Sequence, residues 1–110
     1  METRTLINGT CPECRGPLTE VQEDHIVQYE CLVGHVYSPR ALLDGHSEAQ
    51  ERTLWAAVVA LEETKNIVGA VRSHLPPERT QRLEAQVLRK QEQAESIRRI
   101  LEQLEPFDID

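Results

Sequence analysis

All three cysteines of this chain lie in two short clusters that also hold a histidine. Cys11 and Cys14 are spaced C-x2-C, and Cys31 and His35 are spaced C-x3-H. Thiolates and an imidazole in this arrangement are typical ligands of a tetrahedral zinc ion. We therefore predict that these four residues bind one Zn2+. Four protein ligands fill the coordination sphere, which is typical of a structural site and leaves no position open for catalysis.

Other interpretations of these residues are a set of unrelated buried cysteines, a thiol redox centre, and a metal site with His25 as its fourth ligand. Pro12, Glu13 and Arg15 make the first pair polar and turn-like, which disfavours simple burial. The C-x2-C motif also performs redox chemistry, but His35 at the second cluster favours a metal. His25 is separated from Cys31 by a strand of about 20 Å, which places it at a hairpin tip.

Composition limits the classes of function. The chain has 110 residues and a formal net charge of -7, from 19 acidic and 12 Lys and Arg residues. Its length suits one modest domain, and its charge repels phosphate backbones. An odd number of cysteines disfavours a secreted disulfide framework, and no apolar run is long enough to span a bilayer. We expect a cytoplasmic protein that contacts no membrane.

The pattern along the chain predicts a small α+β fold, in which a zinc-ribbon-like β-hairpin module precedes a long antiparallel two-helix hairpin. Residues 1–9 are expected to be a lead-in. Residues 10–45 form the zinc-binding module, with strands around 18–21 and 25–30 and a short helix over 39–43 that ends near Gly45. Gly34 supplies a positive φ at the second cluster.

Residues 46–105 are expected to form the helical hairpin, and 106–110 an acidic tail. Ser47 begins a capping box, and Pro76-Pro77 joins two helices of roughly 28 residues each. The apolar stripe of the first comprises Leu54, Ala57, Val58, Leu61, Val68, Val71 and Leu75, and that of the second comprises Leu83, Val87, Ala94, Ile97, Leu101 and Leu104.

Two features exceed what an isolated hairpin needs. The segment from Trp55 to Leu61 is apolar nearly all round the helix, so the zinc module, a second copy of the chain, or both must cover the surface that the second helix leaves exposed. We predict a homodimer interface at Trp55, Ala56, Val59 and Ala60. Lys65 and Lys90 lie on the stripes at one level. Either their ammonium groups reach out to water, or they form a polar layer that fixes register.

Several blocks together resemble a known module. These are Cys11-Pro-Glu-Cys-Arg-Gly-Pro-Leu18, Tyr29-Glu-Cys-Leu-Val-Gly-His-Val-Tyr-Ser38, Ala41-Leu-Leu43, Ser47-Glu-Ala49 and Leu54-Trp-Ala-Ala-Val-Val-Ala-Leu-Glu-Glu63. They are similar to the metal-binding C-terminal segment of some bacterial chemotaxis-type protein-glutamate methylesterases. The resemblance covers about residues 10–75 and implies the same four metal ligands and a bacterial signalling context. The methylesterase catalytic domain has no counterpart here, so no esterase activity is implied.

We therefore predict a zinc-stabilised regulatory or interaction protein of bacterial signalling, of a chemotaxis-like kind, with no catalytic residue. The main alternative is a nucleic-acid-binding zinc ribbon. Residues 1–46 disfavour it, because they carry only Arg4, Arg15 and Arg40 against seven acids. A zinc hydrolase would need water in place of one ligand and a nearby acid–base carboxylate. A thiol-redox or metal sensor is the remaining alternative.

Overall fold

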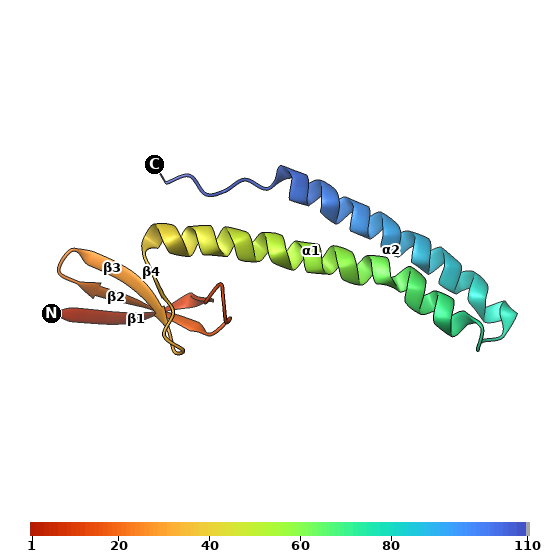
Figure 1. Ribbon diagram of the computed structural model, residues 1–110, viewed down its shortest axis with the longest axis horizontal. Helices are drawn as coiled ribbons and strands as arrows, with labels where there is room; N and C mark the ends of the chain where they lie inside the picture. Colours follow the sequence, from red (N-terminus) through yellow and green to blue (C-terminus); the bar gives the residue numbers. More distant parts are fainter. Residues whose placement is uncertain (110) are drawn as a thin grey trace. The chain divides into compact units, whose positions relative to one another are not determined.

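The computed structural model describes residues 1–109, which form a four-stranded sheet followed by two helices. The strands are β1 (Glu2–Thr10), β2 (Pro17–Glu23), β3 (Ile26–Cys31) and β4 (Val36–Tyr37), and the helices are α1 (Pro39–Arg72) and α2 (Pro77–Gln103). The predicted α+β fold, a β-hairpin and then a helical hairpin, is confirmed (Figure 1). The chain divides into two compact units. The metal-site unit contains residues 1–50 and the residues from 105 onward, and the hairpin unit contains residues 51–104.

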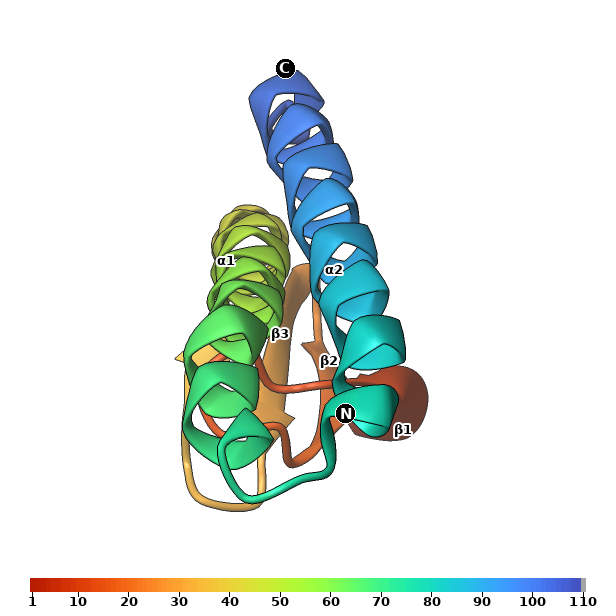
Figure 2. The ribbon, with the colours of Figure 1, turned by 90° about the vertical axis from the view of Figure 1, so that its right-hand side faces the viewer.

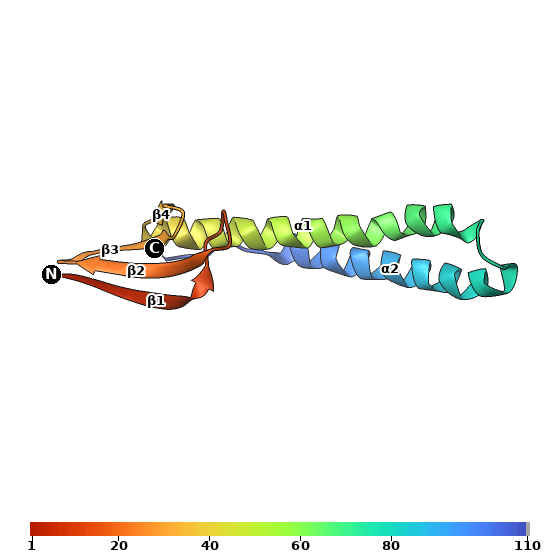
Figure 3. The ribbon, with the colours of Figure 1, turned by 90° about the horizontal axis from the view of Figure 1, so that it is seen from below.

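The sheet is antiparallel throughout, in the order β1-β2-β3-β4. Figure 3 shows β1, β2 and β3 running beside one another. The predicted hairpin is β2–β3, in which Leu18 pairs with Cys31 and Glu23 pairs with Ile26. Its turn contains Asp24, whose φ of 57° suits the left-handed region that aspartate tolerates. This register places Cys31 opposite Leu18, near the start of β2 and therefore close to the first cysteine pair.

The sequence predicted that residues 1–9 are a lead-in. The structure shows instead that Glu2–Thr10 forms strand β1. It pairs with β2 from Glu2 opposite Glu23 to Leu6 opposite Thr19, and again at Thr10 opposite Pro17. The strand is exposed almost throughout, so it lacks the apolar alternation that marks a half-buried strand. Its stability comes mainly from backbone pairing to β2, which no local pattern reveals.

The core of the metal-site unit is small and contains two of the predicted ligands. Its buried members are Cys11, Leu18, Cys31 and Tyr37, with Ile7, Tyr29 and Leu42 packed against them. Because so little apolar area is buried, the sulfurs of Cys11 and Cys31 form a large share of the core.

Helix α1 is continuous from Pro39 to Arg72, so the predicted break near Gly45 is wrong. Its start is as predicted, since the Ser38 Oγ accepts a hydrogen bond from the Ala41 backbone N–H at 3.1 Å. Ser47 lies inside the helix and caps nothing. A helical glycine costs about 1 kcal/mol relative to alanine, which is too little to end a helix that is held by packing. Here a Cβ at position 45 would lie 3.1 Å from Pro12 Cγ, so glycine permits the close approach of α1 to the first cysteine pair.

Helices α1 and α2 run antiparallel and side by side, as Figures 1 and 2 show. The predicted stripes form the interface. Val58 is 0% exposed and Ala94 is 1% exposed, and most other stripe residues are half-buried. Val71 and Leu104 are exposed. The Arg98 guanidinium lies 5.4 Å above the centre of the Trp55 ring and donates to both Glu62 carboxylate oxygens at 2.9 Å.

Lys65 and Lys90 are both exposed and line separate grooves on the hairpin. This arrangement agrees with ammonium groups that reach water, and it does not support a buried polar layer.

The predicted acidic tail is described as far as residue 109, and Asp110 lies outside the described residues. The Phe107 ring stacks on His46, with 6.3 Å between ring centres and 17° between planes. Within residues 1–109, neither helix combines the length and apolar character that a membrane crossing requires.

Candidate metal centre

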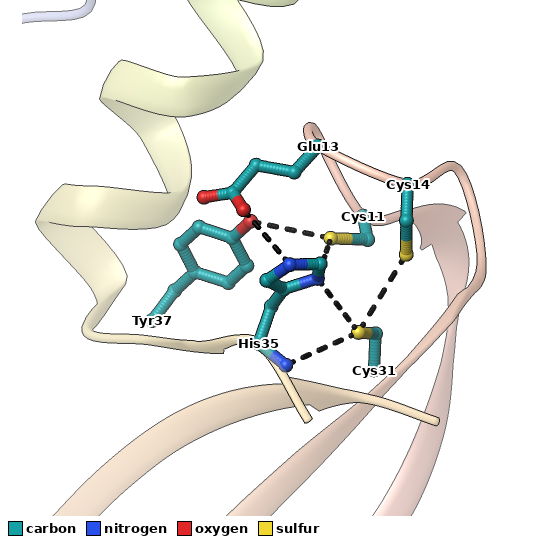
Figure 4. Close-up of polar contacts among 6 residues, drawn as sticks. All are labelled: Cys11, Glu13, Cys14, Cys31, His35 and Tyr37. Atoms are coloured by element: carbon teal, nitrogen blue, oxygen red, sulfur yellow. Dashed lines mark hydrogen bonds and ion pairs between the residues drawn. The ribbon is translucent and has the colours of Figure 1, made fainter. Parts of the chain in front are cut away.

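The four predicted ligands converge on one point. One ligand atom from each of Cys11, Cys14, Cys31 and His35 lies within 4.8 Å of all the others (Figure 4). Cys11 follows β1, Cys14 lies in the turn before β2, Cys31 ends β3, and His35 precedes β4. The β2–β3 pairing brings the two clusters together, although they are far apart in the sequence.

Each cluster sits in a tight turn that is closed by backbone hydrogen bonds. In the first, the Cys11 N–H donates to the Gly16 carbonyl at 2.7 Å, and the Arg15 N–H donates to the Cys11 carbonyl at 2.8 Å. In the second, the Gly34 N–H donates to the Cys31 carbonyl at 3.2 Å. Gly34 has a φ of 111°, as its role in the sequence predicted. The first turn takes its positive φ of 61° at Arg15, which the sequence did not indicate.

The spacing of the donor atoms fits a tetrahedral ion. Bonds of ~2.3 Å to sulfur and ~2.0 Å to nitrogen place two sulfurs ~3.8 Å apart and a sulfur and a nitrogen ~3.5 Å apart. The Cys14 and Cys31 sulfurs are 3.7 Å apart, and His35 Nδ1 lies 3.6 Å from Cys11 Sγ and 3.3 Å from Cys31 Sγ. The cluster could therefore hold a metal ion with little rearrangement of its side chains.

Hydrogen bonds to the sulfurs favour their ionised form. Burial raises the pKa of Cys31, but the His35 backbone N–H, which donates to its Sγ at 3.3 Å, and the Cys14 thiol outweigh it and lower that pKa to about 6. At Cys11, burial is likewise outweighed by the Tyr37 hydroxyl and nearby backbone N–H groups, and the pKa is lowered. The thiolate is the form that binds metal. The lowered pKa values of Cys11 and Cys31 therefore favour metal binding by these two sulfurs.

Cys14 is the exception among the three. The Gly16 backbone N–H favours its thiolate, but burial and the Cys31 and Cys11 sulfurs outweigh this and raise the pKa of Cys14. A metal that binds here therefore displaces a proton from Cys14.

The imidazole of His35 is held from both sides. Its Nδ1 faces the sulfurs, and its Nε2 lies 2.9 Å from the Glu13 carboxylate. An Nε2–H donated to a carboxylate leaves the Nδ1 lone pair free for a metal and strengthens it as a ligand. The sequence pattern identified Glu13 only as a polar residue of the first cysteine turn. Its position inside the C-x2-C motif, opposite a ligand histidine, is the signal that was missed.

Tyr37 is a second supporting residue that the sequence did not single out. Its hydroxyl lies 3.2 Å from Cys11 Sγ and its side chain belongs to the buried core. Burial first, and then the hydrogen bond to Cys11, raise the pKa of Tyr37, so the hydroxyl keeps its proton as a donor. Its place only two residues after the predicted ligand His35 could have identified it.

The remaining candidates lie elsewhere. His25 occupies the β2–β3 turn and is not among the residues that converge on this point. His46 contacts Gln50 and Phe107. Ala56, Val59 and Ala60 are exposed on α1, and Trp55 is 42% exposed beneath Arg98.

No protein-family model matches the chain, and neither a curated protein nor a solved structure matches it significantly.

Proposed function

We propose that Cys11, Cys14, Cys31 and His35 bind one Zn2+ and that this ion stabilises the fold. The observation that carries the proposal is the convergence of three sulfurs and one nitrogen at tetrahedral spacing. Three soft thiolates with one imidazole favour zinc over the harder divalent ions. Because four protein ligands complete the sphere, we propose a structural role for the ion and no enzymatic activity for the protein.

The test is metal analysis of protein purified without added metal. We expect one zinc per chain, and we expect Cys31→Ser to lose it. His25→Ala is the matched control, because His25 is the other histidine considered as a ligand, and it should retain full zinc. Stoichiometric iron, or no metal, would contradict the proposal.

We further propose that the protein acts through contacts with other proteins in bacterial signalling, within the reducing cytoplasm. This rests on the resemblance of residues 10–75 to the metal-binding segment of chemotaxis-type methylesterases. The three cysteines of this chain are free thiols, which suits a reducing compartment.

The same role includes self-association through the outer face of α1, which we define as Ala56, Val59, Ala60, Ile67 and Ala70. Val59 is 51% exposed and Ile67 is 59% exposed. In a two-fold dimer the outer face of α1 would meet its own copy, so this face should carry few charges of one sign. Glu63 is the one acid that falls on this face, which meets that requirement. Trp55 is partly covered by Arg98 and would contribute its exposed edge.

A further inference from the structure

Four of the six Lys and Arg residues of α2 lie on one side of the helix. With 100° per residue, one side carries Arg79, Arg82, Gln86, Arg89, Lys90 and Gln93, which we call the basic face. The acids beyond the first turn, Glu84, Glu92, Glu95 and Glu102, fall on the other side. Beyond the first turn this face carries several cations and no carboxylate, which is unexpected in a chain whose net charge is -7. Glu78, in the first turn, lies at the border of the face, four residues before Arg82.

A groove runs along the basic face where α1 and α2 meet. It has a volume of about 370 Å3, and Thr64, Val68, Leu83, Gln86, Val87, Arg89, Lys90 and Gln93 line it. The aliphatic residues Val68, Leu83 and Val87 are half-buried, whereas Arg89 and Lys90 are exposed. The groove therefore has an apolar floor with two cations at its edge.

The groove on the opposite side of the hairpin differs in charge. It measures about 470 Å3 and includes Glu84, which forms an ion pair with Arg72. Among the described residues, neither Arg89 nor Lys90 has an ion-pair partner, while Arg72 and Arg98 each have one. Among the described residues, no carboxylate therefore lies within ion-pair distance of these two cations.

We propose that the basic face docks an amphipathic helix of a partner protein that carries acidic residues beside its apolar stripe. Its aliphatic side chains would enter the groove over Val68 and Val87, and its carboxylates would pair with Arg89 and Lys90. A third helix laid along a helical hairpin is a common way to cover such a groove. The inference rests on the interaction role proposed above and names the chemistry of the partner.

The charge of the groove and the aliphatic residues at its base favour an acidic helix over a second copy of this chain or a nucleic acid. A second copy joined by a two-fold axis would place one basic face against another, which like charges oppose. Single-stranded nucleic acid is held mainly by stacking on aromatic rings, and this groove is lined by none. An acidic helix matches both the cations and the aliphatic floor.

The test uses a synthetic amphipathic peptide of about 20 residues, long enough to form a helix, with leucines on one side and flanking glutamates. Binding to the zinc-loaded protein is measured by fluorescence anisotropy at low salt. We expect the glutamate peptide to bind and a lysine version of it not to bind. Arg89→Glu should weaken binding at least ~10-fold, because reversal of a charge turns an attraction into a repulsion.

Arg99→Glu is the matched control, because Arg99 lies on the other side of α2 and the charge change is identical; it should keep normal binding. Arg89→Gln/Lys90→Gln, which adds no carboxylate, should weaken binding in the same direction as Arg89→Glu. Absence of glutamate-peptide binding, or equal losses in Arg89→Glu and Arg99→Glu, would overturn the proposal. So would binding of duplex DNA or anionic vesicles in place of the peptide. Zinc content and oligomeric mass, measured on the same samples, show separately whether the proposed function holds.

Discussion

At the scale of single residues, the candidate metal centre includes two groups that would not themselves contact the ion. Glu13 fixes the orientation of His35 through Nε2, and the Tyr37 hydroxyl stabilises charge on Cys11 Sγ. Partners of this kind typically change metal affinity by about 10- to 100-fold when removed. The ligand set alone therefore understates the number of residues on which binding depends.

Tyr37→Phe should weaken zinc binding by roughly 10-fold, because it removes the hydroxyl that favours the Cys11 thiolate. The affinity is measured by competition with a chromophoric chelator. Tyr29→Phe is the control, since its hydroxyl donates instead to Glu20 at 3.0 Å. Equal affinities in the two variants would show that the Tyr37 hydroxyl does not support the site.

At the scale of elements, the first turns of α1 and the first cysteine turn are fitted to each other. Gly45 faces Pro12 so closely that a Cβ would lie 3.1 Å from Pro12 Cγ and 3.3 Å from Pro12 Cβ. A helix that begins immediately after β4 thus packs against the turn that holds Cys11 and Cys14. A glycine that resembles a helix stop in the sequence is instead a point of close contact.

Gly45→Val should destabilise the metal-site unit by about 1 to 3 kcal/mol, because overpacking forces α1 and Pro12 apart. Thermal unfolding of the zinc-loaded protein measures the change. Gly69→Val is the control, since a Cβ at that position meets nothing within 4 Å and only the small propensity difference remains. The prediction fails if the two substitutions shift the melting temperature alike.

At the scale of the whole molecule, the two units differ in what stabilises them. In the metal-site unit the small core includes Cys11 and Cys31, so a bound ion would organise that core. The hairpin unit buries only Val58 and Ala94 completely among its described residues, and leaves an apolar outer face on α1. We therefore expect the stability of the first unit to depend on metal and that of the second to depend on a partner.

Val59→Glu should convert the proposed dimer into a monomer. An unpaired carboxylate buried at an interface costs about 3 kcal/mol, which raises the dissociation constant by ~100-fold. Sedimentation equilibrium at micromolar concentration measures the mass. Gln81→Glu, an added acid at an exposed position on α2, should leave the wild-type mass unchanged. A monomeric wild type would reject the dimer.

Removal of zinc with a strong chelator should unfold the metal-site unit first. Its sheet loses the ion at its core, whereas the hairpin unit keeps both of its apolar stripes. Residue-resolved hydrogen exchange should show protection lost in β2 and β3 and retained between residues 51 and 104. Simultaneous loss of protection throughout the chain would instead identify a single cooperative unit.

The sequence alone predicted which four residues converge at the candidate metal centre, and it predicted the β2–β3 hairpin and the helical hairpin. Ligand spacing, residue alternation and a double proline are local signals that act over a few residues. The tertiary structure decided the rest. Strand β1 exists through its pairing with β2, and α1 continues through Gly45 because Pro12 packs there. Glu13 and Tyr37 become part of the metal centre only when separate turns are brought together. These features depend on contacts between segments, and a residue pattern read along one segment contains no information about the group that will face it.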